Sequence, residues 1–162
     1  LPGRDDQVTV STLEARVARL EDLRAIEQLK YRYARCCDAG YDLAGFRAIF
    51  VPHGRWAANG FGSFEGIEAI CGHFSELSRN VVEALHHVTA PEIAIDADGM
   101  HATARFYLNC LSRSRNRRDP SIIDLFLTMG TYRDRLVRGA QGWLFEEIVV
   151  EVGHVSRIGQ GR

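Results

Sequence analysis

An aspartate and a histidine are the first residues of this chain whose types and positions could do chemistry. Asp38 closes the stretch KYRYARCCD, at the end of a long predicted helix, where the helix dipole disfavours a carboxylate. His86 opens the strand-like stretch HHVTAPEIAID, and an imidazole can move protons at neutral pH. Taken alone, Asp38 reads as a solvated helix-end residue and His86 as a structural histidine. Only a fold that brings the two together makes them an acid–base pair.

Two adjacent histidines raise the question of which one faces the interior. Neighbouring side chains of a strand point to opposite faces, so His86 and His87 cannot share a cavity. Val88 shares the face of His86 and suits an apolar wall, whereas Thr89 shares the face of His87. We therefore expect His86 to face inward and His87 to face away.

Tyr33 lies on the apolar stripe of the same predicted helix, with Ile26 and Leu29. The ordinary role of such a tyrosine is core packing with its hydroxyl hydrogen-bonded. An ideal helix places Tyr33 and Asp38 about 140° apart. They share a cavity only if the helix loosens at its end or the cavity wraps around it.

Motifs for metals, phosphates and covalent catalysis are missing from the sequence. The six histidines have no metal-ligand spacing, and the four cysteines form no CxxC pair, which favours reduced thiols in a cytoplasm. There is no GxSxG, no P-loop and no GxGxxG, and NGFGSFEG lacks the context of a phosphate cradle. We expect no metal and no cofactor.

Hydrophobic periodicity predicts helices first and strands later. The start of the first helix has capping-box spacing at Ser11 and Glu14, and Asp42 is the expected cap of the second. Helices are expected over 11–40, 42–50 and 66–80, a short strand with a Gly-rich turn over 54–66, and strands over 86–96, 102–113, 122–137 and 143–155.

This order predicts an α+β layer fold. We expect a cone-shaped, curved antiparallel or mixed sheet of roughly four to six strands, with three to four N-terminal helices enclosing an apolar pocket. Residues 1–10 are expected to be a flexible arm, 11–155 a single domain and 156–162 a tail.

Composition limits the classes of partner. The chain has 162 residues and a net charge of −1, which favours one domain and argues against a nucleic-acid or membrane surface. No apolar run approaches the length of a membrane span, and the first ten residues lack a signal-peptide pattern. We expect a cytoplasmic protein.

Four stretches together resemble the SnoaL-like, nuclear-transport-factor-2-like superfamily. They are LRAIEQLKYRYARCCDAGYDLAGFRAIF, GSFEGIEAI, HHVTAPEI and GTYRDRLVRGAQGWLF, and the resemblance runs from about Leu23 to about Val150. Within the superfamily the pattern is similar to bile acid 7-alpha-dehydratase, hexachlorocyclohexane dehydrochlorinase and scytalone dehydratase. The resemblance implies a cone-shaped α+β barrel, a homo-oligomer with a trimer favoured over a dimer, and cofactor-free elimination by an Asp–His pair.

The resemblance also implies roles for individual residues. Asp38 matches the aspartate that holds the catalytic histidine, and His86 matches that histidine, in the pattern His-x-x-Thr. His86 is expected to be neutral at rest and to take a C–H proton or deliver one to a leaving hydroxyl. Tyr33 matches a tyrosine that donates a hydrogen bond to the reacting oxygen. The dehydrochlorinase has lysine and arginine where this chain has Tyr33 and Ile148, and the bile acid enzyme has aspartate where it has Cys110.

The expected substrate is a cyclic, largely apolar small molecule. On the strand over 102–113 the polar face and the apolar face could each line the pocket. The residues expected to bind substrate are Trp56, Phe61, Val88, Arg105, Tyr107, Asn109, Cys110, Leu127 and Ile148. The leading hypothesis is a dehydratase-type lyase, with a polyketide cyclase or isomerase that uses the same pair, or a non-catalytic ligand-binding domain, as alternatives.

Overall fold

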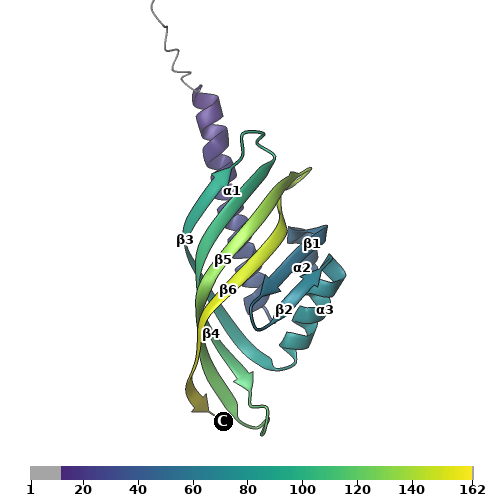
Figure 1. Cartoon of the computed structure of the whole chain (residues 1–162), viewed down its shortest axis with the longest axis vertical. Helices are drawn as coiled ribbons and strands as arrows, with labels where there is room; N and C mark the ends of the chain where they lie inside the picture. The colour runs from purple at the N-terminus through teal and green to yellow at the C-terminus, as the bar shows by residue number, and fades with distance from the viewer. Residues whose placement is uncertain (1–11, 162) are drawn as a thin grey trace, which may run out of the picture.

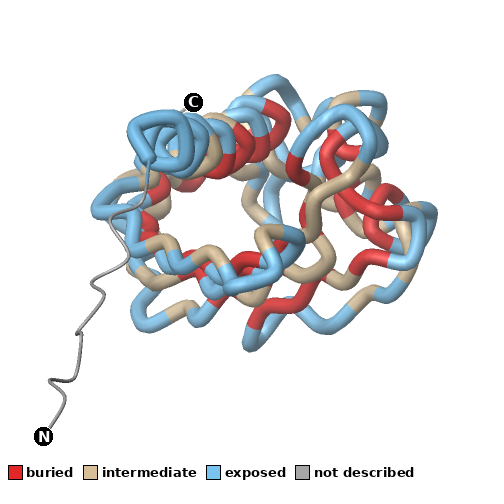
Figure 2. Tube along the Cα trace, turned by 90° about the horizontal axis from the view of Figure 1, so that it is seen from above, coloured by how far each residue is buried: buried red, intermediate tan, exposed pale blue. Residues whose placement is uncertain are grey.

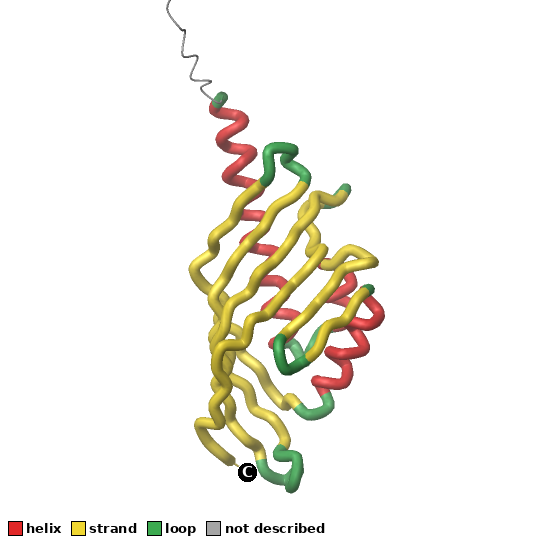
Figure 3. The backbone as a smooth tube through the Cα atoms, in the orientation of Figure 1, coloured by secondary structure: helices red, strands yellow, loops and turns green. Residues whose placement is uncertain are grey.

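Three helices lie against one face of a curved six-stranded sheet in the computed structural model, which describes residues 12–161 (Figures 1 and 3). The elements in chain order are α1 (Leu13–Asp38), α2 (Leu43–Ile49), β1 (Phe50–Ala58), β2 (Gly62–Glu65), α3 (Ile67–Ser78), β3 (Val81–Ile95), β4 (His101–Arg115), β5 (Ile123–Gly139) and β6 (Gly142–Gly161).

The sheet is mixed and open. Its strand order is β2-β1-β6-β5-β4-β3, with β1 parallel to β6 and the other neighbours antiparallel. The predicted α+β fold with a curved mixed sheet is confirmed, and the structure has three helices. The prediction of a barrel is wrong, because the sheet does not close: β2 and β3 remain its two edges in the described residues.

Alternation along the long strands separates an inner face from an outer face. On β4 the side chains of Ala104, Phe106, Leu108 and Cys110 are buried toward the helices, and those between them are exposed. Figure 2 shows the same division on α1, whose buried residues lie on the side that faces the sheet. The core therefore lies between the inner face of the sheet and the three helices.

The first two helices begin with side-chain caps, whereas α3 begins after Gly66 without one. Thr12 caps α1 by accepting a hydrogen bond from the backbone N–H of Ala15 at 3.2 Å, while the expected cap Ser11 lies outside the described residues. Asp42 caps α2 as predicted, because its Oδ1 accepts from the N–H of Ala44 at 3.1 Å.

Two predictions about the ends of the chain need correction, and a third lies outside the described residues. Helical spacing predicts that the apolar stripe of α1 also includes Leu13, Val17 and Leu20, but these side chains are exposed, because this part of α1 extends past the sheet (Figure 1). Most of the expected tail is strand, since β6 continues to Gly161 and pairs with β5. The expected arm over 1–10 is not described by the structure.

None of the described helices is both long enough and apolar enough to cross a membrane.

Candidate active site

Asp38 and His86 are hydrogen-bonded to each other at the wall of a cavity. Asp38 is the last residue of α1, and His86 lies on β3. The Nδ1 of His86 is 2.6 Å from Oδ1 of Asp38, and the backbone N–H of His86 donates to the same carboxylate, at 3.0 Å to Oδ1 and 3.3 Å to Oδ2. The carboxylate thus holds both the ring and the backbone of one residue. Because Nδ1 faces Asp38, Nε2 is the ring nitrogen left for a ligand.

His86 faces the cavity, whereas His87 is exposed on the other face of β3. The side chain of His86 is 12% exposed and lines the cavity, whereas that of Asp38 is 24% exposed and is not part of the cavity wall, so a ligand in the cavity meets the pair through His86. Strand alternation therefore gives the orientation that the sequence predicted. It holds over this segment because β3 pairs regularly with β4 from Glu83 to Thr89, and the next irregularity follows Thr89, where Ala90 has a positive φ of 52°.

The pKa of His86 is raised to about 9. Burial by itself lowers it, because burial penalises the imidazolium, but the hydrogen bond to Asp38 and the nearby Cys110 outweigh burial. His86 is therefore protonated at neutral pH. This contradicts the expectation that His86 is neutral at rest, because the hydrogen bond to Asp38 that holds the ring also stabilises the imidazolium.

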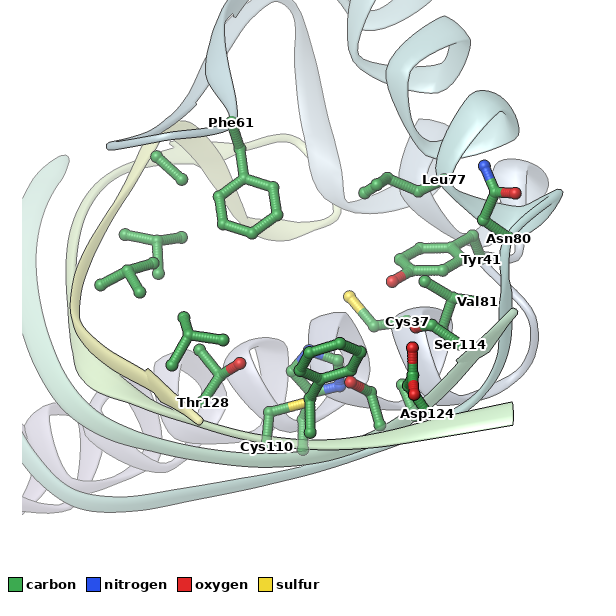
Figure 4. A pocket seen from close by; sticks show the side chains of 18 of the residues that line it. Cys37, Tyr41, Phe61, Leu77, Asn80, Val81, Cys110, Ser114, Asp124 and Thr128 are labelled. Carbon is green, nitrogen blue, oxygen red and sulfur yellow. The ribbon is translucent and has the colours of Figure 1, made fainter. Parts of the chain in front are cut away.

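The cavity beside the pair has a volume of about 670 Å³ and a largely apolar wall. Figure 4 shows side chains from the helices and from the sheet pointing into it. The inner part of the wall includes Cys37, Tyr41, Phe74, Leu77, Ala84, Leu108, Thr128, Tyr132, Val150 and Val152. A cavity of this size fits a small molecule with one or several rings.

Three of the residues expected to bind substrate line this cavity: Trp56, Phe61 and Cys110. Ile148 is fully buried in the core, and Val88 packs against the core without reaching the cavity wall.

The other four expected binding residues lie on the outer face of the sheet. Arg105, Tyr107 and Asn109 occupy the exposed positions of β4, opposite Cys110, and Leu127 pairs with the exposed Leu111 across β4 and β5. The apolar face of β4, not the polar one, lines the cavity. A strand buries its apolar face under the helices. The alternation of apolar and polar residues along β4 therefore already indicated which of its faces lines the cavity.

Tyr33 lies in the core beneath the cavity and is not part of its wall. Its ring packs against five aromatic rings, namely those of Phe46, Phe50, Phe74, Tyr132 and Phe145. Its hydroxyl accepts a hydrogen bond from the Nε1 of Trp56 at 2.8 Å. Burial raises the pKa of Tyr33 far above its ordinary value. In this arrangement the hydroxyl of Tyr33 is the hydrogen-bond acceptor of the Trp56 indole.

Two other tyrosines reach the cavity, and sequence reasoning missed both. Tyr41 stacks on Phe74 with ring centroids 5.4 Å apart, and its hydroxyl points into the cavity (Figure 4). Its φ of 64° is unusual for a residue other than glycine, and strain of this kind accumulates at functional sites. Tyr132 contributes to the same wall from β5. Burial raises the pKa of both, so both remain protonated hydrogen-bond donors.

A second acid–base pair lies deeper, beneath Tyr132. The Nζ of Lys30 on α1 is 3.1 Å and 3.0 Å from the two carboxylate oxygens of Asp134 on β5, and both side chains are fully buried. The same Nζ lies 3.3 Å from the ring centroid of Tyr132. Burial lowers the pKa of Lys30 and raises that of Asp134, while each charge opposes the shift of the other.

No cluster of three or more histidine, cysteine, aspartate or glutamate side chains that could hold a metal ion occurs within residues 12–161.

Comparison with known proteins identifies the family of the chain. A family model described as a SnoaL-like domain matches residues 18–149. No curated protein matches the chain.

Three solved structures with a similar fold have 14–22% sequence identity to this chain. A hexachlorocyclohexane dehydrochlorinase of Novosphingobium barchaimii LL02 is 14% identical, covers 89% of this chain and 94% of its own, and has a TM-score of 0.77. A protein of Novosphingobium aromaticivorans DSM 12444, provisionally named a scytalone dehydratase, is 19% identical over 89% of this chain and 92% of its own, with a TM-score of 0.75. An NTF2-like protein with a cystatin-like fold from Novosphingobium aromaticivorans is 22% identical over 93% and 92%, with a TM-score of 0.65.

Proposed function

Because the chain belongs to the SnoaL-like family, we propose that it is a cofactor-independent lyase that catalyses a dehydratase-type elimination on a cyclic, largely apolar small molecule. The observation that carries the proposal is the 2.6 Å contact between His86 and Asp38 at the wall of an apolar cavity. The names of two similar structures, a dehydrochlorinase and a dehydratase, agree with elimination chemistry.

Dehydration removes a hydroxyl from one carbon and a proton from its neighbour. His86, protonated at neutral pH, donates its Nε2 proton to the leaving hydroxyl, which departs as water. The neutral ring then accepts the proton of the neighbouring carbon, so a double bond forms and His86 regains its starting state. Asp38 stabilises the imidazolium and fixes the ring orientation. Positioned proton transfer of this kind accelerates a reaction by about 10²–10⁴-fold.

A second hydrogen-bond donor is needed at the leaving oxygen, on which partial negative charge develops while its bond to carbon breaks. Tyr41 and Tyr132 supply protonated hydroxyls at the cavity wall, and a fixed donor aimed at developing charge stabilises the transition state. We assign this role to them rather than to Tyr33, because Tyr33 does not line the cavity and its hydroxyl is hydrogen-bonded to Trp56.

The Asp38–His86 pair distinguishes this proposal from a non-catalytic binding domain, which has no need of it. A polyketide cyclase or an isomerase would use the same pair as a base, and the test below separates these reactions.

The test starts from a panel of hydroxylated apolar ring compounds ranked by thermal shift. Each compound that binds is incubated with wild type and with His86→Ala, and the products are analysed by mass spectrometry. The proposal expects loss of one water with wild type only. A product of unchanged mass would indicate an isomerase or a cyclase, and binding without any product would indicate a binding domain.

We also propose that a second copy of this chain covers the outer face of the sheet, in a trimer rather than a dimer. The register aligns Leu85, Leu111 and Leu127 across β3, β4 and β5, and Tyr107 and Met129 are exposed beside them. Exposed apolar patches of this kind mark interfaces.

Light scattering at micromolar concentration tests the assembly. Wild type should have the mass of a trimer, and Leu111→Glu should shift it to the monomer, because a carboxylate would then be buried in the interface. Arg105→Glu, at the polar end of the same strand face, is the matched control. A monomeric wild type would contradict the proposal.

A further inference from the structure

Arginines gather at the open end of the cavity, away from the dyad. The connection between β4 and β5 lies at the lower tip of the molecule in Figure 1. Arg115, Arg117 and Arg118, together with Asn116, come from this connection and line the mouth, where Arg157 of β6 joins them.

The three arginines of this connection differ from the others in the same part of the chain. Among the described residues, Arg115, Arg117 and Arg118 have no carboxylate within 4 Å, the limit for an ion pair. All other arginines of residues 50–161 have one: Arg55, Arg79, Arg105, Arg113, Arg133, Arg135, Arg138 and Arg157. Within residues 50–161, the arginines without an ion pair are therefore all at this end of the cavity.

Hydrogen bonds hold this connection in place. The Oδ1 of Asn116 accepts from the backbone N–H groups of Arg118 and Asp119 at 2.8 Å and 3.2 Å, and its Nδ2 donates to Asp124 at 2.7 Å. Asp124 is the one carboxylate in the mouth, and it already accepts from Gln160 at 3.1 Å and lies 3.4 Å from Arg157. The carboxylate of Asp124 is thus hydrogen-bonded to other residues and forms no ion pair with Arg117 or Arg118.

The strand register gives the distance between the two ends of the site. His86 pairs with Cys110, and Arg115 lies five residues farther along β4. At a rise of about 3.3 Å per residue, the arginine end is roughly 17 Å from the dyad.

We propose that the substrate carries an anionic group, a carboxylate or a phosphate, on an arm that reaches this mouth, where Arg117 and Arg118 bind it. A guanidinium donates two parallel hydrogen bonds to such a group, which fixes its position as well as its charge. The apolar rings then occupy the inner cavity beside His86. Only this last statement, that the rings lie at the reacting end, rests on the proposed function.

Binding of a fluorescent apolar acid tests the anion site without any turnover. The probe is dansylaminoundecanoic acid, and its methyl ester is the uncharged match. Wild type should bind the acid on the order of tenfold more tightly than the ester, as expected for hydrogen bonds to a charged group. The double variant Arg117→Ala/Arg118→Ala should lose this preference and keep its affinity for the ester, which also shows that the variant is folded.

Arg113→Ala is the control, because Arg113 belongs to the same strand end, pairs with Glu83 and lies outside the cavity. It should keep the preference for the acid. Competition by dodecanoate, dodecyl phosphate and dodecanol then shows which anion the mouth prefers, with dodecanol as the weak competitor. Equal binding of acid and ester by wild type, or an equal loss in Arg113→Ala, would overturn the inference.

The outcome is separable from that of the proposed function. If the protein prefers the acid through Arg117 and Arg118 but turns over no compound, the anion site is supported and the proposed lyase activity is contradicted. Turnover that depends on His86 without any acid preference would do the reverse. If neither probe binds, the cavity is not an apolar ligand site and the inference falls.

Discussion

Two of the acid–base pairs that connect α1 to the sheet differ in what surrounds them. Lys30 and Asp134 are both fully buried, while His86 and Asp38 are 12% and 24% exposed and His86 lines the cavity. Lys30 and Asp38 stand eight residues apart on α1, about 12 Å along its axis. One helix thus carries a sealed pair and an open pair two turns apart.

The difference shows what separates a structural pair from one that can do chemistry. The sealed pair has no surface through which a proton could reach a substrate, and it is enclosed by the rings of Tyr33, Phe106, Tyr132 and Phe145. The open pair presents Nε2 of His86 to a cavity. Each pair joins a basic side chain to a carboxylate, so the difference in access is the reason why we propose catalysis for one pair and a stabilising role for the other.

The largest expected effect is on turnover through the open pair. His86→Ala and Asp38→Asn should each lower kcat by about 10²–10⁴-fold, because each removes the positioned proton transfer. The double variant should be little worse than either single variant, since the two residues act as a unit. His87→Ala, on the other face of β3, is the control and should stay within several-fold of wild type. A dead His87→Ala with an active His86→Ala would place the catalytic side chain one residue away from our assignment.

The next effect is on stability through the sealed pair. Lys30→Met or Asp134→Asn leaves one buried charge without its partner, which should lower the free energy of unfolding by about 3–5 kcal/mol. The double variant Lys30→Met/Asp134→Leu removes both charges and should recover most of this loss. Urea denaturation measures each variant, with Asp38→Asn as the comparison from the open pair. A larger loss in Asp38→Asn than in Asp134→Asn would reverse the roles that we give to the pairs.

The pH dependence of the free energy of unfolding tests the raised pKa of His86 in the open pair. The pKa of His86 is about 9 in the folded chain and 6.5 ordinarily, so the folded state binds this proton more tightly. Its contribution, on the order of 3 kcal/mol, is fully present below pH 6.5 and is lost as the pH rises through 9. Urea denaturation of wild type and His86→Ala between pH 6 and pH 10 isolates it. A difference between the two proteins that stays constant over this range would contradict the raised pKa.

The sequence predicted much of the open pair and none of the sealed one. Asp38 was recognisable as a helix end and His86 as an inward strand residue, because local periodicity determines both positions. Nothing local connects Lys30 with Asp134, whose contact depends on how α1 crosses β5. Tyr41 was missed for the same reason, since its hydroxyl enters the cavity only through the turn that follows α1.

The smallest expected effect concerns Tyr33, which lies between the two pairs. Its hydroxyl accepts from Trp56, and its ring is 4.8 Å from the Nζ of Lys30. Tyr33→Phe keeps the ring and removes the acceptor, so a buried indole N–H loses its partner at a cost of about 1–3 kcal/mol in unfolding free energy. Turnover should stay within several-fold of wild type.

Tyr41→Phe is the matched variant, because it removes a hydroxyl that faces the cavity and has no hydrogen-bond partner among the described residues. It should lower kcat by about tenfold or more, as loss of a donor to developing charge does, with little change in stability. Measuring kcat and urea denaturation for both variants therefore gives opposite patterns. If Tyr33→Phe loses turnover and Tyr41→Phe keeps it, Tyr33 donates to the reacting oxygen as the sequence predicted, and the core around Trp56 must open when substrate binds.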